Sequence, residues 1–136
     1  MTKKIEKEDI DFEISFYNGL IQKEPDFVQA YIALGELYTQ RGMYAQGLAV
    51  DEKLVQLKPE DPFVLYNLGC SYSLLGHIDK AYRSVKKAIK YGYRNFDFLE
   101  QDKDLSNLHK DIRFQQFLKR AKTKNAAGDP DSRGAQ

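Results

Sequence analysis

The chain has 136 residues, of which 42% are hydrophobic and 30% are charged, a composition typical of one soluble packed domain rather than a disordered chain. No run of apolar residues is long enough to span a bilayer, and the charged start MTKKIEKEDIDFEI lacks the apolar core of a secretory signal. The single cysteine, Cys70, excludes an intramolecular disulfide. We therefore expect a cytoplasmic protein without membrane insertion.

The first predicted element is a helix within residues 9–25. It shares a register with a later segment, since Leu20 precedes Leu54 by 34 residues and Pro25 precedes Pro59 by the same interval. This register predicts the second helix of a pair whose first helix is missing. Such a half repeat would cap the N-terminal side of the array.

Two helices are predicted within residues 28–61. The first carries its apolar residues at helical spacing, namely Ala30, Tyr31, Leu34, Leu37 and Tyr38. Gly42 stands where a C-capping glycine ends a helix. The second helix covers Tyr44–Leu57 and ends at Pro59.

The same cycle returns in residues 62–95. Asp61 is the predicted N-cap of a helix over about 62–75, with Pro62 in its first turn. A turn at Gly76 then leads to a helix over about 78–91. The two units share residues at an interval of 34, which are Leu34/Leu68, Gly35/Gly69, Tyr38/Tyr72, Gly42/Gly76, Gly47/Ala81 and Leu54/Ala88.

A third unit begins and fails over residues 96–122. The expected Leu, Gly and Tyr are replaced, and the pattern predicts a short helix, a turn and a final helix over Asp111–Lys122. The last repeat of an array needs an atypical cap because no neighbour covers it. Residues 125–136 hold no aromatic residue and no aliphatic residue beyond Ala, so we expect a disordered tail.

A 34-residue period of helix–turn–helix units resembles the tetratricopeptide repeat family, and the closing segment resembles that of small bacterial members. The resemblance implies an all-α fold in which antiparallel helix pairs form a right-handed superhelix. One domain over 1–124 would hold a half repeat, two full repeats and a C-terminal cap. Gly35 and Gly69 are expected where paired helices approach closely, because a Cβ would separate the backbones.

In that family the first helix of each pair lines a concave groove that holds a peptide or a partner helix. Carried over to this sequence, the groove positions are Gln29, Ile32, Glu36, Thr39, Phe63, Tyr66, Asn67, Cys70 and Leu74. The resemblance thus predicts a non-catalytic interaction module, acting as an adaptor or scaffold on a protein partner. An alternative stays open, in which the C-terminal segment or the half repeat covers this strip.

One subtype of the family, which holds the C-terminal carboxylates of chaperones, fits poorly. Its groove carries a cluster of Lys, Arg and Asn, of which only Asn67 is matched here. Glu36 would repel a carboxylate. We expect a different ligand.

Charge is distributed unevenly, which supports a second hypothesis. Residues 1–68 hold 7 Lys/Arg and 12 Asp/Glu, and residues 69–136 hold 14 and 8, giving −5 and +6. Opposite ends of this kind favour head-to-tail assembly into a homo-oligomer. A basic row lies along one face of the predicted helix over 78–91, formed by Lys80, Arg83, Lys87 and Lys90. It would suit nucleic acid or anionic lipid, but a solvated outer face is the favoured interpretation, and no nucleic acid is expected.

The residue patterns of enzymes and cofactor sites are not found. His77 and His109 have no second ligand at metal-binding spacing, and no glycine-rich phosphate loop occurs. Cys70 lies seven residues before His77, an arrangement more typical of a packed thiol than of a nucleophile. We predict no enzyme activity, no cofactor and no metal.

Overall fold

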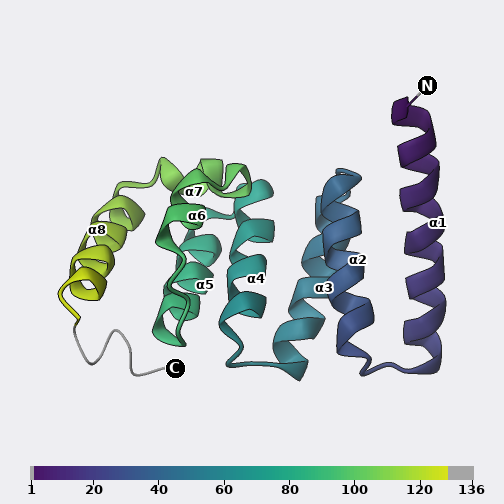
Figure 1. Ribbon diagram of the computed structural model, residues 1–136, viewed down its shortest axis with the longest axis horizontal. Helices are drawn as coiled ribbons and strands as arrows, with labels where there is room; N and C mark the ends of the chain where they lie inside the picture. The colour runs from purple at the N-terminus through teal and green to yellow at the C-terminus, as the bar shows by residue number, and fades with distance from the viewer. Residues whose placement is uncertain (1, 129–136) are drawn as a thin grey trace. The chain divides into compact units, whose positions relative to one another are not determined.

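The computed structural model describes residues 2–128, with side chains from Glu6 onward, and these residues form helices joined by turns, with no strand among them (Figure 1). The helices form two compact units, Met1–Lys58 and Pro59–Gln136. The prediction of one domain over residues 1–124 stays a prediction. The predicted all-α fold of helix pairs is confirmed.

The helices of each unit follow the predicted order. Unit 1 holds α1 (Thr2–Lys23), α2 (Val28–Gln40) and α3 (Tyr44–Leu57). Unit 2 holds α4 (Pro62–Leu74), α5 (Ile78–Lys90), α6 (Phe96–Gln101), the 3-10 turn η1 (Lys103–Leu105), α7 (Ser106–His109) and α8 (Ile112–Ala126).

Each full helix pair turns at a glycine with left-handed backbone. Gly42 has φ 77° and Gly76 has φ 79°, angles that side-chain-bearing residues rarely adopt. In the first turn the Met43 amide donates to the Tyr38 carbonyl at 2.8 Å, and the second turn repeats this bond. Such bonds satisfy carbonyls left open at a helix end. The predicted roles of both glycines are confirmed.

The start of α4 is also fixed by the predicted residues. The Asp61 carboxylate accepts hydrogen bonds from the amides of Phe63 at 2.9 Å and Val64 at 3.2 Å, while Pro62 occupies the first turn. These bonds satisfy amides that lack a partner within the helix. They set the register that decides which α4 side chains face α5.

In unit 1, α2 packs between α1 and α3, and Leu34 is fully buried in its core. Polar contacts also tie α1 to the end of α2. The Asn18 amide nitrogen donates to the Tyr38 hydroxyl at 3.1 Å, and Arg41 pairs with Asp11 at 2.8 Å. The half repeat predicted from the 34-residue register therefore packs as the neighbour of α2.

Two predicted boundaries fall short of the observed ones. Helix α1 begins at Thr2 rather than near residue 9, because residues 2–8 are mostly Lys and Glu, which favour helix. Helix α8 continues to Ala126, so the predicted tail begins two residues inside a helix, and Gly128 with φ 71° follows its end. Residues 129–136 lie outside the described part of the chain.

In unit 2, α4 and α5 approach each other closely at Gly69. A Cβ built there would lie 2.5 Å from the Val85 Cγ2 and 3.4 Å from the Ala81 carbonyl oxygen. The equivalent contact in unit 1 is looser, since a Cβ on Gly35 would lie 3.1 Å from the Asp51 carboxylate. The prediction of a close helix approach is confirmed at Gly69, whereas a Cβ on Gly35 would meet side-chain atoms only.

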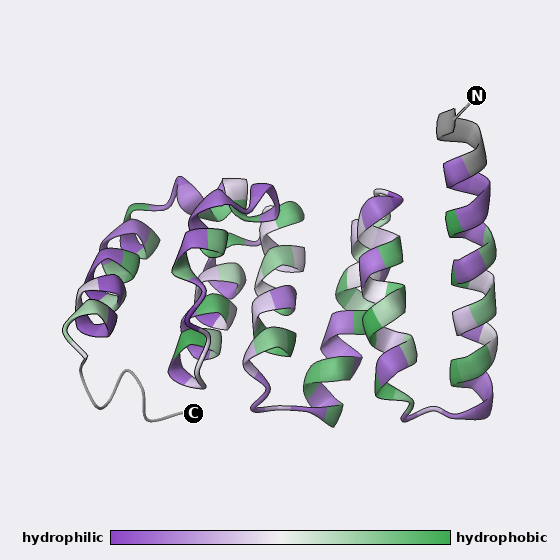
Figure 2. Cartoon of the chain, in the orientation of Figure 1, coloured by the Kyte–Doolittle hydropathy of each residue, from purple (hydrophilic) through white to green (hydrophobic). Residues whose placement is uncertain are grey.

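The segment η1–α7 packs against α4, and α7 also packs against α5. Helix α4 is largely hydrophobic along its length, whereas hydrophobic and hydrophilic residues alternate along α8 (Figure 2). Buried Ser73 anchors the segment. Its hydroxyl accepts from the Leu108 amide at 3.2 Å, and its carbonyl accepts from the Asn107 side chain at 2.8 Å. The predicted failure of a third repeat thus takes the form of a short irregular cap.

Replacing Gly69 with Ala should destabilise unit 2 by about 1–3 kcal/mol, because the added methyl group overlaps Val85. Gly19→Ala is the matched control, since Gly19 lies in α1 with nothing within 4 Å of a built Cβ. That change should stabilise α1 by about 1 kcal/mol through helix propensity alone. Urea unfolding followed by circular dichroism measures both. Equal stabilisation by the two substitutions would contradict the close contact.

Candidate functional site

The predicted groove positions of unit 1 all lie on α2. Gln29, Ile32 and Glu36 are exposed and follow each other at intervals of three and four residues, so they share one face of the helix. Thr39 is half-buried, and its hydroxyl donates to the Gly35 carbonyl at 3.0 Å. The first three side chains are available to a partner, while the Thr39 hydroxyl is already bonded.

The predicted positions of unit 2 lie on α4 and differ in exposure. Phe63 is 66% exposed, Asn67 is exposed, and Leu74 is half-buried. Tyr66 and Cys70, which we expected to face the groove, are only 4% and 8% exposed. The alternative interpretation applies to these two residues, because the C-terminal segment covers them.

Asp102, between α6 and η1, is the residue of this segment that contacts both Tyr66 and Cys70. Its carboxylate accepts a hydrogen bond from the Tyr66 hydroxyl at 2.6 Å and lies 3.7 Å from the Cys70 thiol. It also caps η1 by accepting from the Asp104 amide at 3.0 Å. One carboxylate therefore joins two side chains of α4 to the cap.

Burial sets the protonation of this cluster. Burial, followed by the neighbouring Cys70 thiol and the Asp102 carboxylate, raises the pKa of Tyr66 far above its ordinary value, so the hydroxyl is a permanent donor. Burial and the same carboxylate raise the pKa of Cys70. A thiol is nucleophilic as the thiolate, so protonated Cys70 is a poor nucleophile near neutral pH.

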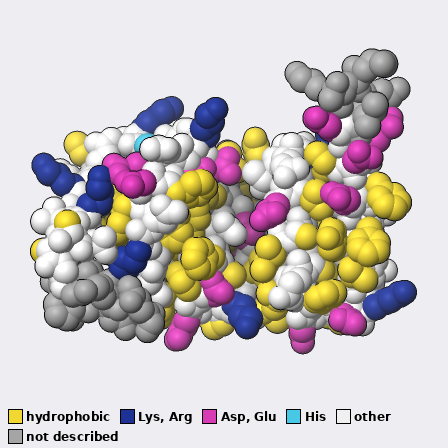
Figure 3. Space-filling view, viewed as in Figure 1, with side chains coloured by type: hydrophobic (Ala, Val, Ile, Leu, Met, Phe, Trp, Pro, Cys, Tyr) yellow, Lys and Arg dark blue, Asp and Glu magenta, His cyan; other side chains and the backbone are white. Residues whose placement is uncertain are grey.

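Four rings form an aromatic patch around this cover: Phe63, Tyr66, Tyr93 and Phe98. Tyr66 and Tyr93 stack with ring centroids 4.4 Å apart, and Phe63 and Tyr93 make a T-shaped contact with centroids 5.9 Å apart. Phe98 lies 6.2 Å from Tyr66 and is 52% exposed. Figure 3 shows hydrophobic side chains gathered over α4 and α6. The exposed rings of Phe63 and Phe98 thus pack against the buried rings of Tyr66 and Tyr93.

Sequence reasoning missed Phe98 because it lies where the repeat register fails. The available signal was the spacing of Phe96 and Phe98 in a helix, since residues two apart point to different sides. Phe96 is buried, which leaves Phe98 exposed. An aromatic pair at this interval at the start of a capping helix therefore indicates one core ring and one surface ring.

The described residues show neither a cluster of metal ligands nor a membrane-spanning helix. From residue 2 to residue 128 no three His, Cys, Asp or Glu side chains gather as metal ligands would, and no helix has the length and apolar character needed to cross a bilayer. The His109 ring is 2.9 Å from the Leu99 carbonyl. His77 lies beside the Tyr72 ring, with centroids 6.0 Å apart.

Comparison with known proteins agrees with the repeat register. The model of the tetratricopeptide repeat matches residues 64–91, which span α4 and α5. The chain is 30% identical over 111 residues to a chloroplastic protein of Arabidopsis thaliana, covering 79% of this chain and 33% of that protein. It is 31% identical over 77 residues to the peroxisomal targeting signal receptor of Komagataella phaffii, covering 57% and 13%.

A third relative is Hsp70-Hsp90 organizing protein 3 of Arabidopsis thaliana, 26% identical over 87 residues, which cover 64% of this chain and 16% of that protein. The chain spans about a third or less of the length of these relatives. They come from a plant and a yeast, so a bacterial source stays a prediction. The repeat register, the glycine-ended helix pairs and the matched model agree: the chain belongs to the tetratricopeptide repeat family.

Proposed function

We propose that the chain is a non-catalytic interaction module that binds a segment of a protein partner, and that the aromatic patch of unit 2 is its main contact surface. Support comes from Phe63 and Phe98, two exposed rings held by the stacked pair Tyr66 and Tyr93. Rigid aromatic side chains contribute large contact area at low entropic cost, which makes them frequent anchors of interfaces.

Family membership supports the class of ligand. Two relatives carry names that refer to protein ligands, a peroxisomal targeting signal in one and Hsp70 and Hsp90 in the other. The face of α2 in unit 1 that carries Gln29, Ile32 and Glu36 would offer a second contact surface of mixed polarity. Glu36 disfavours a carboxylate ligand there.

Photo-crosslinking tests the surface directly. A benzophenone amino acid placed at position 63 should capture a partner protein in cells of the source organism, and Phe98→Ala should reduce the yield several-fold because it removes the neighbouring anchor. The same probe at Lys80, exposed on α5 outside the patch, is the matched control. Mass spectrometry identifies the crosslinked species. Equal capture at positions 63 and 80 would contradict the aromatic patch as the binding surface.

Self-assembly is the second candidate, and α1 supplies an observation in its favour. Phe12 and Phe16 are 73% and 55% exposed, one helical turn apart. Exposed Asp9 lies three residues before Phe12, and exposed Glu13 lies three residues before Phe16, so both carboxylates are on the same side of α1 as the rings. Such an acidic aromatic face would suit the basic half of a second copy, in a head-to-tail contact.

Sedimentation velocity tests this candidate. The chain should self-associate at low salt and dissociate as salt screens the contact. Phe16→Ser should weaken association at every salt concentration, while Phe98→Ser should leave it unchanged because Phe98 lies on α6, outside both the α1 face and the basic row of α5. A monomer at high protein concentration and low salt would exclude self-assembly.

A further inference from the structure

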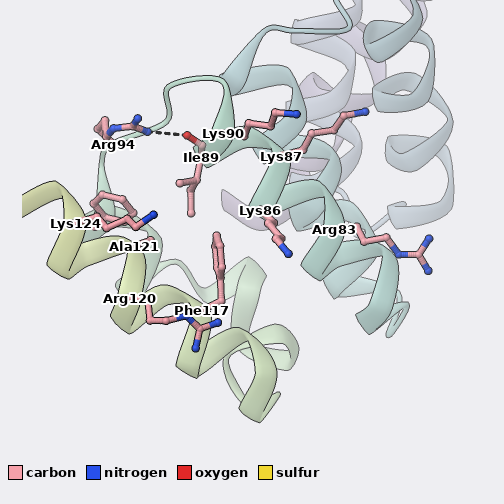
Figure 4. A pocket seen from close by; sticks show the side chains of 11 residues that line it. Arg83, Lys86, Lys87, Ile89, Lys90, Arg94, Phe117, Arg120, Ala121 and Lys124 are labelled. Carbon is pink, nitrogen blue, oxygen red and sulfur yellow. Dashed lines mark hydrogen bonds between the residues drawn. The ribbon is translucent and has the colours of Figure 1, made fainter. Parts of the chain in front are cut away.

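A basic pocket of about 620 Å³ lies between α5 and α8, within unit 2 (Figure 4). Its size falls in the range of sites for small ligands. Seven cationic side chains line it, which are Arg83, Lys86, Lys87, Lys90, Arg94, Arg120 and Lys124. The remaining lining side chains are apolar, which are Ile89, Phe96, Phe117 and Ala121.

The centre of the basic pocket is apolar. In Figure 4 the Phe117 ring of α8 and the Ile89 side chain of α5 point toward each other, and the head groups of Lys86 and Arg120 lie beside the ring. The Lys86 ammonium sits 5.6 Å from the Phe117 centroid. An apolar group would therefore meet Phe117 and Ile89, with positive charge close to its end.

Positive charge around the basic pocket is unbalanced. No Asp or Glu lines it, and none of its seven cations forms an ion pair with a carboxylate among the residues of unit 2 that the structure describes. On the neighbouring surfaces of α5 and α8, by contrast, Arg113 pairs with Asp79 and Asp111, and Lys122 pairs with Glu100. The cations of the pocket thus lack the carboxylate partners that Arg113 and Lys122 have.

Arg94 shows the imbalance most clearly. One guanidinium nitrogen donates to the carbonyls of Ile89 at 2.7 Å and Tyr93 at 2.9 Å, which fixes the group at the pocket edge. Its Nε is buried without a partner among the described residues, and burial lowers the pKa of Arg94. A half-buried cation without a counter-charge is costly, and an anion nearby would offset that cost.

We propose that the basic pocket binds a small soluble amphiphilic anion, with its apolar body against Phe117 and Ile89 and its anionic head among the cations of α5 and α8. The two parts of the ligand follow from the two parts of the pocket. An inorganic anion would leave the apolar centre empty, and a neutral amphiphile would leave the charges unbalanced. The pocket shares no residue with the aromatic patch, so this site is independent of the proposed function.

Isothermal titration calorimetry with three probes tests the ligand class. Octyl sulfate monomers, which have both parts, should bind to the full chain with one site. Octyl glucoside keeps the chain without the charge, and sodium sulfate keeps the charge without the chain, so each should bind roughly tenfold or more weakly. Equal affinity for octyl sulfate and either single-part probe would overturn the proposal.

Paired substitutions locate the site. Lys86→Gln combined with Arg120→Gln removes one cation from each wall and should weaken octyl sulfate binding roughly tenfold or more. Lys80→Gln combined with Lys119→Gln is the matched control, with the same helices and the same loss of charge outside the pocket, and should leave the affinity unchanged. Lys80 also matches Lys86 in lying over a tyrosine ring.

If both double variants are folded, as judged by circular dichroism, and weaken octyl sulfate binding equally, the ligand does not bind in the basic pocket. Vesicles of phosphatidylglycerol provide the last arm. Flotation of the chain with vesicles, together with no heat from octyl sulfate, would mean that the cations meet a membrane surface, and the proposal of a small-ligand pocket would be wrong.

Discussion

The close approach of α4 and α5 at Gly69 is the contact on which unit 2 depends. Because Gly69 has no Cβ, the Val85 side chain occupies the space that a Cβ would take, and the two helices approach closely. Helix α4 also packs against η1 and α7, and its Tyr66 stacks on Tyr93, which follows the end of α5. The candidate surface is therefore a consequence of helix packing.

The regular part of the fold could be predicted because its determinants are local. A glycine such as Gly76 ends a helix through its own backbone, and Asp61 caps the next through amides two and three residues away. The interval of 34 residues then transfers each such feature from one unit to the other. The same locality explains why α1 and α8 were predicted too short, since a helix-favouring sequence beyond the last apolar anchor leaves no periodic signal.

The burial of Tyr66 and Cys70 could not be predicted, because it depends on Asp102, which lies 36 residues beyond Tyr66 in a segment outside the repeat register. The basic pocket was missed for a related reason. The cations of α5 could be placed on one face from their spacing, but Phe117, Arg120 and Lys124 face them from α8, whose placement depends on tertiary packing. A solvated face and one wall of a pocket have the same sequence pattern.

The anchoring of the cap on Ser73 limits how arrays of this kind can grow. In an array with more repeats, the next helix pair would pack against the open side of α4 and α5. Here the Ser73 hydroxyl and carbonyl are already bonded to Leu108 and Asn107. Duplicating a repeat after Tyr91 would therefore place a new hairpin in competition with residues 102–109. Lengthening by gene duplication would have to insert units before α4, or delete the cap and supply another terminator.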